Sequence, residues 1–117
     1  MRKYPAGGVV VGIVQAAEAF TVYRNQGVVG QTNVVVTFVE LLWAVVSLVV
    51  LIRVKHRPTR VLAAVFVLYN IAGWILSADV DTSTLPVVIP LRYALIAGVF
   101  GVVYALWSLW IARQPDE

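Results

Sequence analysis

Residues 34–52 read VVVTFVELLWAVVSLVVLI, a run of 19 residues in which Glu40 is the single charged side chain. A helix needs about 20 mostly apolar residues to cross the hydrocarbon core of a bilayer, which is about 30 Å thick. Strands of an outer-membrane barrel would instead alternate polar and apolar residues over about 10 positions. This run therefore predicts a membrane-spanning helix.

Three other stretches have the same length and character, over about residues 5–23, 61–78 and 91–112. The segments between them carry the glycines, prolines and charges that are typical of loops, for example Pro58 in a basic segment and two acids in Asp79–Pro90. Nothing is left over for a soluble domain. We therefore expect residues 1–117 to form one transmembrane domain, an all-α bundle of four helices.

The composition leads to the same class of protein. Of 117 residues, 61% are hydrophobic and 13% are charged, whereas a soluble domain is roughly half apolar and about a quarter charged. Disordered chains are poorer still in apolar residues. There is no cysteine, and His56 is the single histidine, so one copy of the chain lacks the ligands of a thiolate or two-histidine metal site. We predict no metal ion and no intrinsic cofactor.

Basic residues are distributed unevenly between the two predicted sides. Seven fall on the side of the termini and two on the other: Arg2, Lys3, Arg53, Lys55, Arg57, Arg60 and Arg113, against Arg24 and Arg92. Because Lys and Arg are enriched in cytoplasmic segments, we expect both termini in the cytoplasm and a multi-pass protein of the cell inner membrane.

The basic segment between the second and third predicted helices has a simple interpretation. Its Arg53, Lys55, Arg57 and Arg60 lie beside the membrane, where such residues contact anionic lipid headgroups. The net charge of +3 therefore indicates a lipid partner and no nucleic acid.

Small residues are expected to bring the helices together. At 100° per residue, Gly8, Gly12, Gln15 and Ala19 share a narrow arc of the first helix. The fourth helix has a similar face: Ala94, Ala97, Gly98, Gly101, Ala105, Ser108 and Ala112. Small faces of this kind pack closely inside membranes. Four helices of this length rarely enclose a sizeable cavity, so we also expect a homo-oligomer or a larger membrane complex.

Glu18 and Glu40 are the two charged residues expected within the hydrocarbon. Counted from the helix centres, Glu18 lies about 6 Å and Glu40 about 4 to 5 Å to the outer side of the midplane, so the two carboxyls share a depth. An intramembrane acid is by default a candidate functional site. The predicted ligand or proton site is Glu18 and Glu40 with Gln15, Thr37, Tyr69 and Asn70.

Three residues are secondary candidates for this site. Trp43 falls near mid-membrane, where its N–H needs a partner, and Arg24 and Arg92 are the cations nearest the acids. No catalytic residue is assigned, and whether the chain is an enzyme stays open. In the alternative interpretation, each Glu is hydrogen-bonded to its neighbours and only holds helices together.

The stretch Val39-Glu-Leu-Leu42, an apolar run, a basic turn ending Arg57-Pro-Thr-Arg60 and then Val-Leu-Ala-Ala64 resembles the second and third helices of the DoxX-like membrane proteins. The resemblance covers about Thr37–Leu76. This sequence departs from the family pattern in two ways. It lacks the glycines that usually follow the Glu of the second helix, and it carries Glu18, which that pattern does not include. The resemblance implies a subunit of a membrane oxidoreductase complex, with quinone as a cofactor or ligand, and carries over Glu40 and Arg60.

A second resemblance is to the small multidrug transporters, which are also four-helix chains with one Glu in the first helix. Gly7-Gly8 and Ala17-Glu18 are similar to that helix, although Glu40 has no counterpart and the proline and glycine pattern of the third helix is missing. This resemblance implies a proton-coupled small transporter that uses Glu18 and Glu40. A purely structural assembly subunit is the third alternative.

Overall fold

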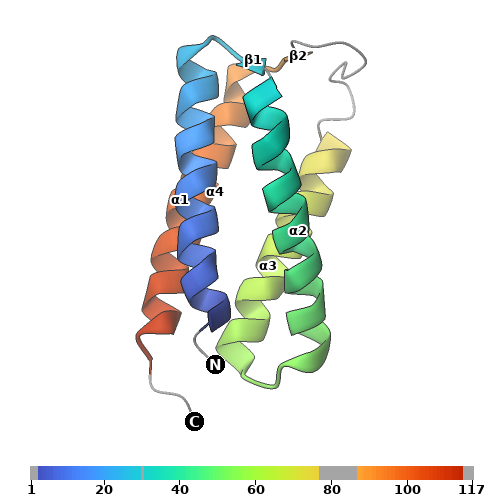
Figure 1. The fold of residues 1–117 in the computed structure, drawn as a ribbon, viewed down its shortest axis with the longest axis vertical. Coiled ribbons are helices and arrows are strands. Elements are labelled where there is room, and N and C mark those ends of the chain that lie inside the picture. Colours follow the sequence, from blue (N-terminus) through green and yellow to red (C-terminus); the bar gives the residue numbers. More distant parts are fainter. Residues whose placement is uncertain (1–2, 30, 77–86, 115–117) are drawn as a thin grey trace.

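The computed structural model describes residues 3–29, 31–76 and 87–114, and these form a helical bundle (Figure 1). Its elements are α1 (Lys3–Arg24), β1 (Val28–Val29), α2 (Gln31–Arg53), α3 (Arg57–Leu76), β2 (Val87–Val88) and α4 (Leu91–Ala112). All four helices are long and apolar enough to cross a membrane. Within the described residues, the prediction of four helices of spanning length is confirmed.

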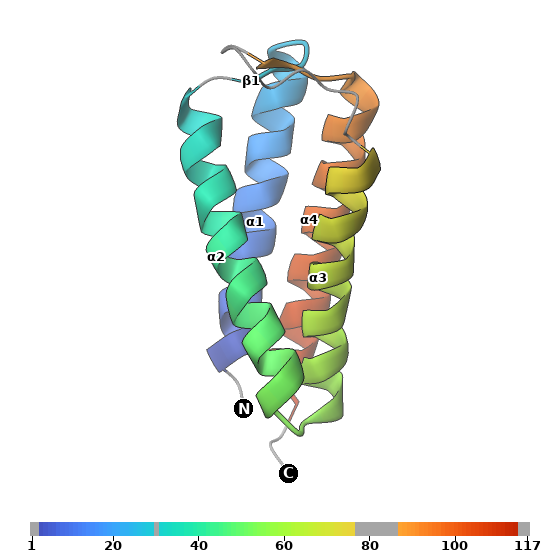
Figure 2. The same ribbon diagram turned by 90° about the vertical axis from the view of Figure 1, so that its right-hand side faces the viewer.

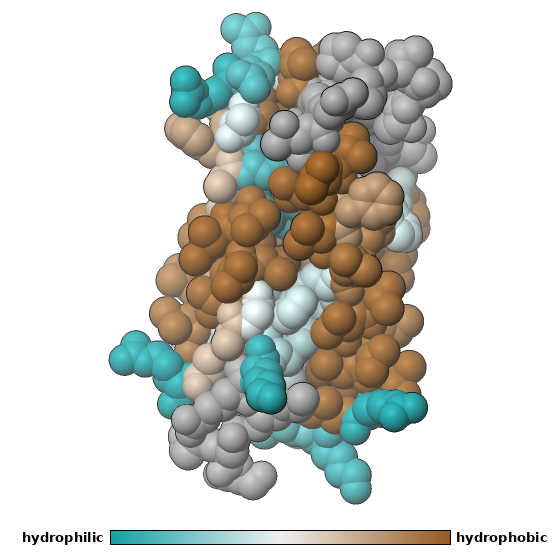
Figure 3. Space-filling model, viewed as in Figure 1, coloured by the Kyte–Doolittle hydropathy of each residue, from teal (hydrophilic) through white to brown (hydrophobic). Residues whose placement is uncertain are grey.

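Charged residues gather at the two ends of the bundle. One end, here called the basic end, holds the start of α1, the end of α4 and the α2–α3 turn, with Lys3, Arg53, Lys55, Arg57, Arg60 and Arg113 (Figure 1). The other end, the ribbon end, holds both strands, with Arg24 and Arg92. Figure 3 shows hydrophilic side chains at both ends and a broad hydrophobic middle.

Three helices begin before the apolar runs that predicted them, whereas α4 begins at Leu91, as predicted. The largest difference is in α3, which begins at Arg57 and not at Val61, because its first turn consists mainly of polar residues that the apolar run does not include. The His56 carbonyl accepts the first helical bond from Arg60 N (3.0 Å), and His56 Nδ1 is 2.7 Å from Thr59 Oγ1. Pro58 fits this turn, where a missing N–H removes no helical bond. The predicted end of this helix at Ala78, and most of the loop Asp79–Pro90, lie outside the described residues.

A short ribbon connects two segments that the sequence predicts to be loops. α1 ends in a Schellman motif, in which Gly27 N donates to Val22 O (2.9 Å) and Gln26, with φ 58°, is left-handed. Val28 then pairs with Val88 in an antiparallel ladder, and Ile89 N donates to Gly27 O (2.9 Å). A side chain on Gly27 would collide with the Ile89 carbonyl. The ribbon therefore fixes the end of α1 against the start of α4.

α1 and α4 approach each other most closely at glycines. A Cβ on Gly12 would lie 2.6 Å from Gly101 O, and one on Gly101 would lie 2.7 Å from Gly12 O. One turn earlier, a Cβ on Gly8 would lie 2.5 Å from Ser108 Oγ. The faces of small residues predicted for α1 and α4 are thus the faces through which these two helices pack, as is typical of helices inside membranes.

The remaining helices complete a four-helix arrangement. Figure 2 shows α1 and α2 on one side of the bundle and α3 and α4 on the other, and α2 and α3 are joined at the basic end by a three-residue turn, Val54–His56. Large side chains fill the space between the α1–α4 and α2–α3 pairs. They include Leu62 and Phe66 of α3 and Tyr104 of α4, which are all at most 1% exposed.

Candidate functional site

The structure brings Glu18 of α1 and Glu40 of α2 together. The carboxyl of Glu40 lies within electrostatic and hydrogen-bonding reach of Glu18. Along the helix axes the two residues are about 9 Å and about 14 Å from the ribbon-end termini of α1 and α2, so both lie in that half of the bundle. A hydrogen bond between two carboxyls requires a proton on one of them. This pair is called the acid pair below.

One atom of the acid pair is unsatisfied. Glu40 Oε1 is buried and has no hydrogen-bond partner within the described part of the chain. A buried polar atom without a partner is costly, and such atoms in native proteins often mark the place of a bound water, ion or ligand. The acid pair therefore has the capacity to accept one more hydrogen bond.

Gln15 and Tyr69 are the neighbours of the acid pair in the bundle interior. Tyr69 of α3 is within hydrogen-bonding reach of Gln15 and close enough to both carboxyls to interact electrostatically. Gln15 is 3% exposed, and its Nε2 donates to Ala97 O of α4 (3.0 Å). The Tyr69 ring stacks on Phe100 of α4, with centroids 3.7 Å apart and planes 5° from parallel. Side chains from α1, α2 and α3 thus meet, and α4 closes the group.

The other two predicted residues have different environments. Asn70 Nδ2 donates to Phe66 O of its own helix (2.8 Å), so that amide nitrogen is engaged within α3. Thr37 is exposed and lies one turn from Glu40 on α2, toward the ribbon end.

A cavity of about 190 Å³ adjoins the acid pair at the ribbon end. It is called the acid pocket. Its walls come from three helices and from the residue that follows β2: Glu18, Ala19 and Val22 of α1, Thr37 of α2, Ile89, and Tyr93, Ala94 and Ala97 of α4. Glu18 and Thr37 are the members of the predicted site that line it. Ile89 and Tyr93 lie close to the β1–β2 ribbon. Helical periodicity alone could not predict that their side chains line this pocket.

The three secondary candidates have environments of their own. Trp43 stacks on Tyr4, with centroids 4.6 Å apart, and its Nε1 donates to Tyr104 OH (3.1 Å). Arg24 is exposed at the end of α1. Arg92 is also exposed, with its guanidinium carbon 4.9 Å from the Tyr93 ring centroid.

A second group of polar side chains, which the sequence did not single out as a site, fills the basic half of the bundle. Tyr4 OH lies 2.5 Å from Ser47 Oγ and 3.0 Å from Tyr104 OH. Ser47 also donates to Trp43 O (2.7 Å). We call Tyr4, Trp43, Ser47 and Tyr104 the tyrosine network. Because its members bond to one another, it closes the interior at this level.

Arg60, which the DoxX-like resemblance carries over together with Glu40, lies at the basic end of the bundle. Its Nε donates to Leu51 O (3.2 Å), about 16 Å further along α2 than Glu40. Among the described residues, no group of three or more His, Cys, Asp or Glu side chains is placed to hold a metal ion.

Comparison of the chain with models of protein families, with curated proteins and with solved structures finds no match. The chemistry of the acid pair and its pocket is therefore the basis for the function proposed below.

Proposed function

We propose that this chain is a multi-pass protein of the cell membrane with both termini in the cytoplasm. Two observations support this setting: the four helices of spanning length and character, and the concentration of exposed cations at the basic end. Within that setting, Arg53, Lys55, Arg57 and Arg60 contact anionic headgroups of the inner leaflet.

The proposed activity is binding of a lipophilic, quinone-type ligand whose ring occupies the acid pocket. The observation that carries this proposal is that Glu18 lines a cavity and is paired with Glu40, whose Oε1 is buried without a hydrogen-bond partner among the described residues. A carboxyl pair that shares one proton presents both a donor and an acceptor. It can therefore hydrogen-bond to a quinone carbonyl or to a quinol hydroxyl.

The size of the acid pocket fits such a ring and little more. Its volume of about 190 Å³ is below the range of about 300 to 1,000 Å³ that is usual for drug-sized ligands. The DoxX-like resemblance makes the chain a membrane subunit of an oxidoreductase complex, and a bound quinone would supply the redox chemistry there. The residues of this chain would hold the ring and exchange a proton with it.

The basic half of the bundle is closed by the tyrosine network, whose Tyr4, Ser47 and Tyr104 are at most 4% exposed. This arrangement supports binding from the ribbon end, and a proton-coupled transporter that uses Glu18 and Glu40 stays the alternative. The acid pocket favours binding over a purely structural role, because a solid contact between α1, α2 and α4 would leave no such volume.

The test is binding of a tail-less dimethoxy-methyl-benzoquinone to the protein in nanodiscs, followed by quenching of tryptophan fluorescence. We expect saturable binding, and a loss of affinity of about tenfold or more in Glu18→Gln and in Glu40→Gln. Glu18→Gln removes the carboxyl in the pocket wall, and Glu40→Gln removes the carboxyl that shares a proton with it. Glu117→Gln makes the same chemical change in the C-terminal tail and should bind like the parent. Saturable binding that both site variants retain would refute the proposal, as would its absence in the parent.

A further inference from the structure

The acid pocket has room for the ring of a lipophilic ligand but not for its hydrocarbon tail. Its volume holds a single ring, and Glu18, Thr37 and Tyr93 make part of its wall polar. A hydrocarbon tail attached to that ring must therefore lie outside the pocket, against an apolar surface that begins at the pocket wall.

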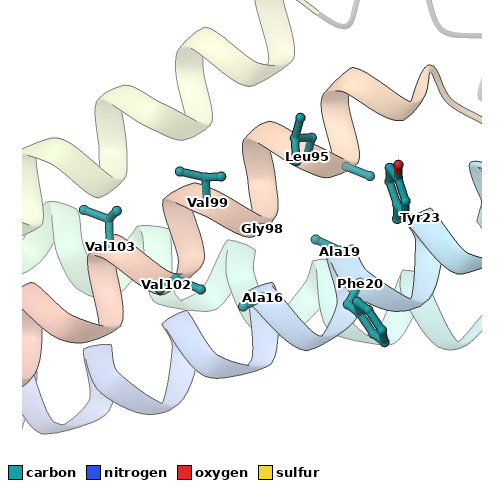
Figure 4. A pocket seen from close by; sticks show the side chains of 10 residues that line it. Ala16, Ala19, Phe20, Tyr23, Leu95, Gly98, Val99, Val102 and Val103 are labelled. Atoms are coloured by element: carbon teal, nitrogen blue, oxygen red, sulfur yellow. The ribbon is translucent and has the colours of Figure 1, made fainter.

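Such a surface exists on the opposite side of the α1–α4 contact. A groove of about 420 Å³ runs along these two helices, lined by hydrocarbon side chains that include Phe20, Leu95, Val99, Val102 and Val103 (Figure 4). From Ala94 to Val103 it extends about 13 Å along α4, from about 5 Å inside the ribbon end, past the level of the acid pair, to the middle of the bundle. This is the direction that a tail would take into the bilayer.

The groove and the acid pocket share two walls. Ala19 of α1 and Ala94 of α4 line both of them, and Figure 4 shows Ala19 projecting from α1 toward α4. At this level the two spaces are separated by methyl groups.

The packing of α1 on α4 is also looser at this level. At Gly12 and Gly101 the backbones touch, whereas a Cβ on Gly98 would lie 3.4 Å from Ala19 Cβ, an ordinary contact distance. At this level the helices therefore meet through the Ala19 methyl group and not through backbone atoms, so side-chain atoms divide the groove from the pocket.

We propose that the groove binds the hydrocarbon tail of the ligand whose ring occupies the acid pocket, and that this ligand enters from the bilayer between Ala19 and Ala94. The inference rests on the proposed function. The ligand class is an amphiphile with a compact, hydrogen-bonding ring and a linear or isoprenoid tail. A phospholipid is the other source of a tail, but its anionic phosphate would face the carboxyl of Glu18 in the pocket wall.

The test compares two probes, the tail-less benzoquinone and the same ring with a ten-carbon tail, on protein in nanodiscs. Val99→Trp and Val102→Trp fill the groove. Val45→Trp is the matched control, because Val45 of α2 is 60% exposed, as Val99 is 58% exposed, and lies away from the groove. We expect each groove variant to bind the tailed ring at least about tenfold more weakly, with unchanged affinity for the tail-less ring.

The outcomes separate the two proposals. Equal affinity of Val99→Trp, Val102→Trp and Val45→Trp for the tailed ring would overturn the tail groove, and the proposed function would stand if the ring still binds and Glu18→Gln abolishes that binding. If neither probe binds the parent protein, both proposals fail. If the groove variants lose both probes to the same extent, the groove has no specific role for the tail and the inference is wrong.

Discussion

At the residue scale, the hydroxyl of Tyr104 connects three helices. It lies 3.0 Å from Tyr4 OH of α1 and accepts from Trp43 Nε1 of α2 at 3.1 Å. We expect Tyr104→Phe to lower the free energy of unfolding by about 1–2 kcal/mol, because two buried groups lose a partner and interhelical hydrogen bonds in membranes are worth about 0.6 to 2 kcal/mol each. Equilibrium unfolding in mixed detergent micelles, followed by circular dichroism, measures this change.

Ser108→Ala is the control for this prediction. Ser108 Oγ is as deeply buried as the Tyr104 hydroxyl, but it has no hydrogen-bond partner within the described ranges. Removing it should leave the free energy of unfolding unchanged or raise it, because a buried unpaired polar atom disappears. Equal destabilisation by the two variants would show that the tyrosine network contributes nothing specific.

The residues of the acid pair also show which part of the site could be predicted. The shared depth of Glu18 and Glu40 follows from the fixed rise of 1.5 Å per residue, and the structure brings them together. Their neighbours depend on helix rotation and rotamers, which composition does not reveal. Two examples are Asn70, which hydrogen-bonds within its own helix, and Trp43, which hydrogen-bonds to Tyr104 in the tyrosine network and not to the acid pair.

At the scale of the elements, the α1–α4 contact depends on the absence of side chains at two crossing positions. A Cβ on Gly12 would lie 2.6 Å from Gly101 O and 2.8 Å from Ala105 N, and backbone atoms cannot move aside as a flexible side chain can. We expect Gly12→Ala to lower the free energy of unfolding by about 1–3 kcal/mol through overpacking. The same micelle unfolding experiment applies.

Gly73→Ala makes the same change where a Cβ would meet nothing within 4 Å. There the gain in helix propensity, up to about 1 kcal/mol, should leave the bundle unchanged or stabilise it. A Gly12→Ala protein as stable as Gly73→Ala would contradict a close backbone contact between α1 and α4.

The elements were predictable to different degrees for physical reasons. Apolar runs mark the hydrocarbon-length core of each helix, but a helix continues into polar residues, as α3 does at Arg57. The small faces indicate that α1 packs closely, yet not on which partner, because small residues occur in every helix. The pairing of Val28 with Val88 is a contact between distant segments with no local signal.

At the scale of the whole molecule, the uneven distribution of charge predicts one orientation in the membrane. The chain has no cysteine, so single cysteines report accessibility without background. Asn25 is exposed at the ribbon end and Lys55 at the basic end. In sealed right-side-out vesicles, we expect Asn25→Cys to react with a membrane-impermeant maleimide, and Lys55→Cys to react only after detergent is added. The reverse pattern would place the basic end outside.

Charge removal tests whether the basic residues cause this orientation. Replacing Arg53, Arg57 and Arg60 by Gln in the Lys55→Cys protein leaves three basic residues on that side against two on the other. Because the bias of Lys and Arg sets the orientation, a fraction of the Lys55→Cys sites should then react without detergent. In the same background, Arg24→Gln and Arg92→Gln increase the bias and should keep this cysteine fully protected. If its protection is the same in both sets, helix packing rather than the basic end determines the orientation.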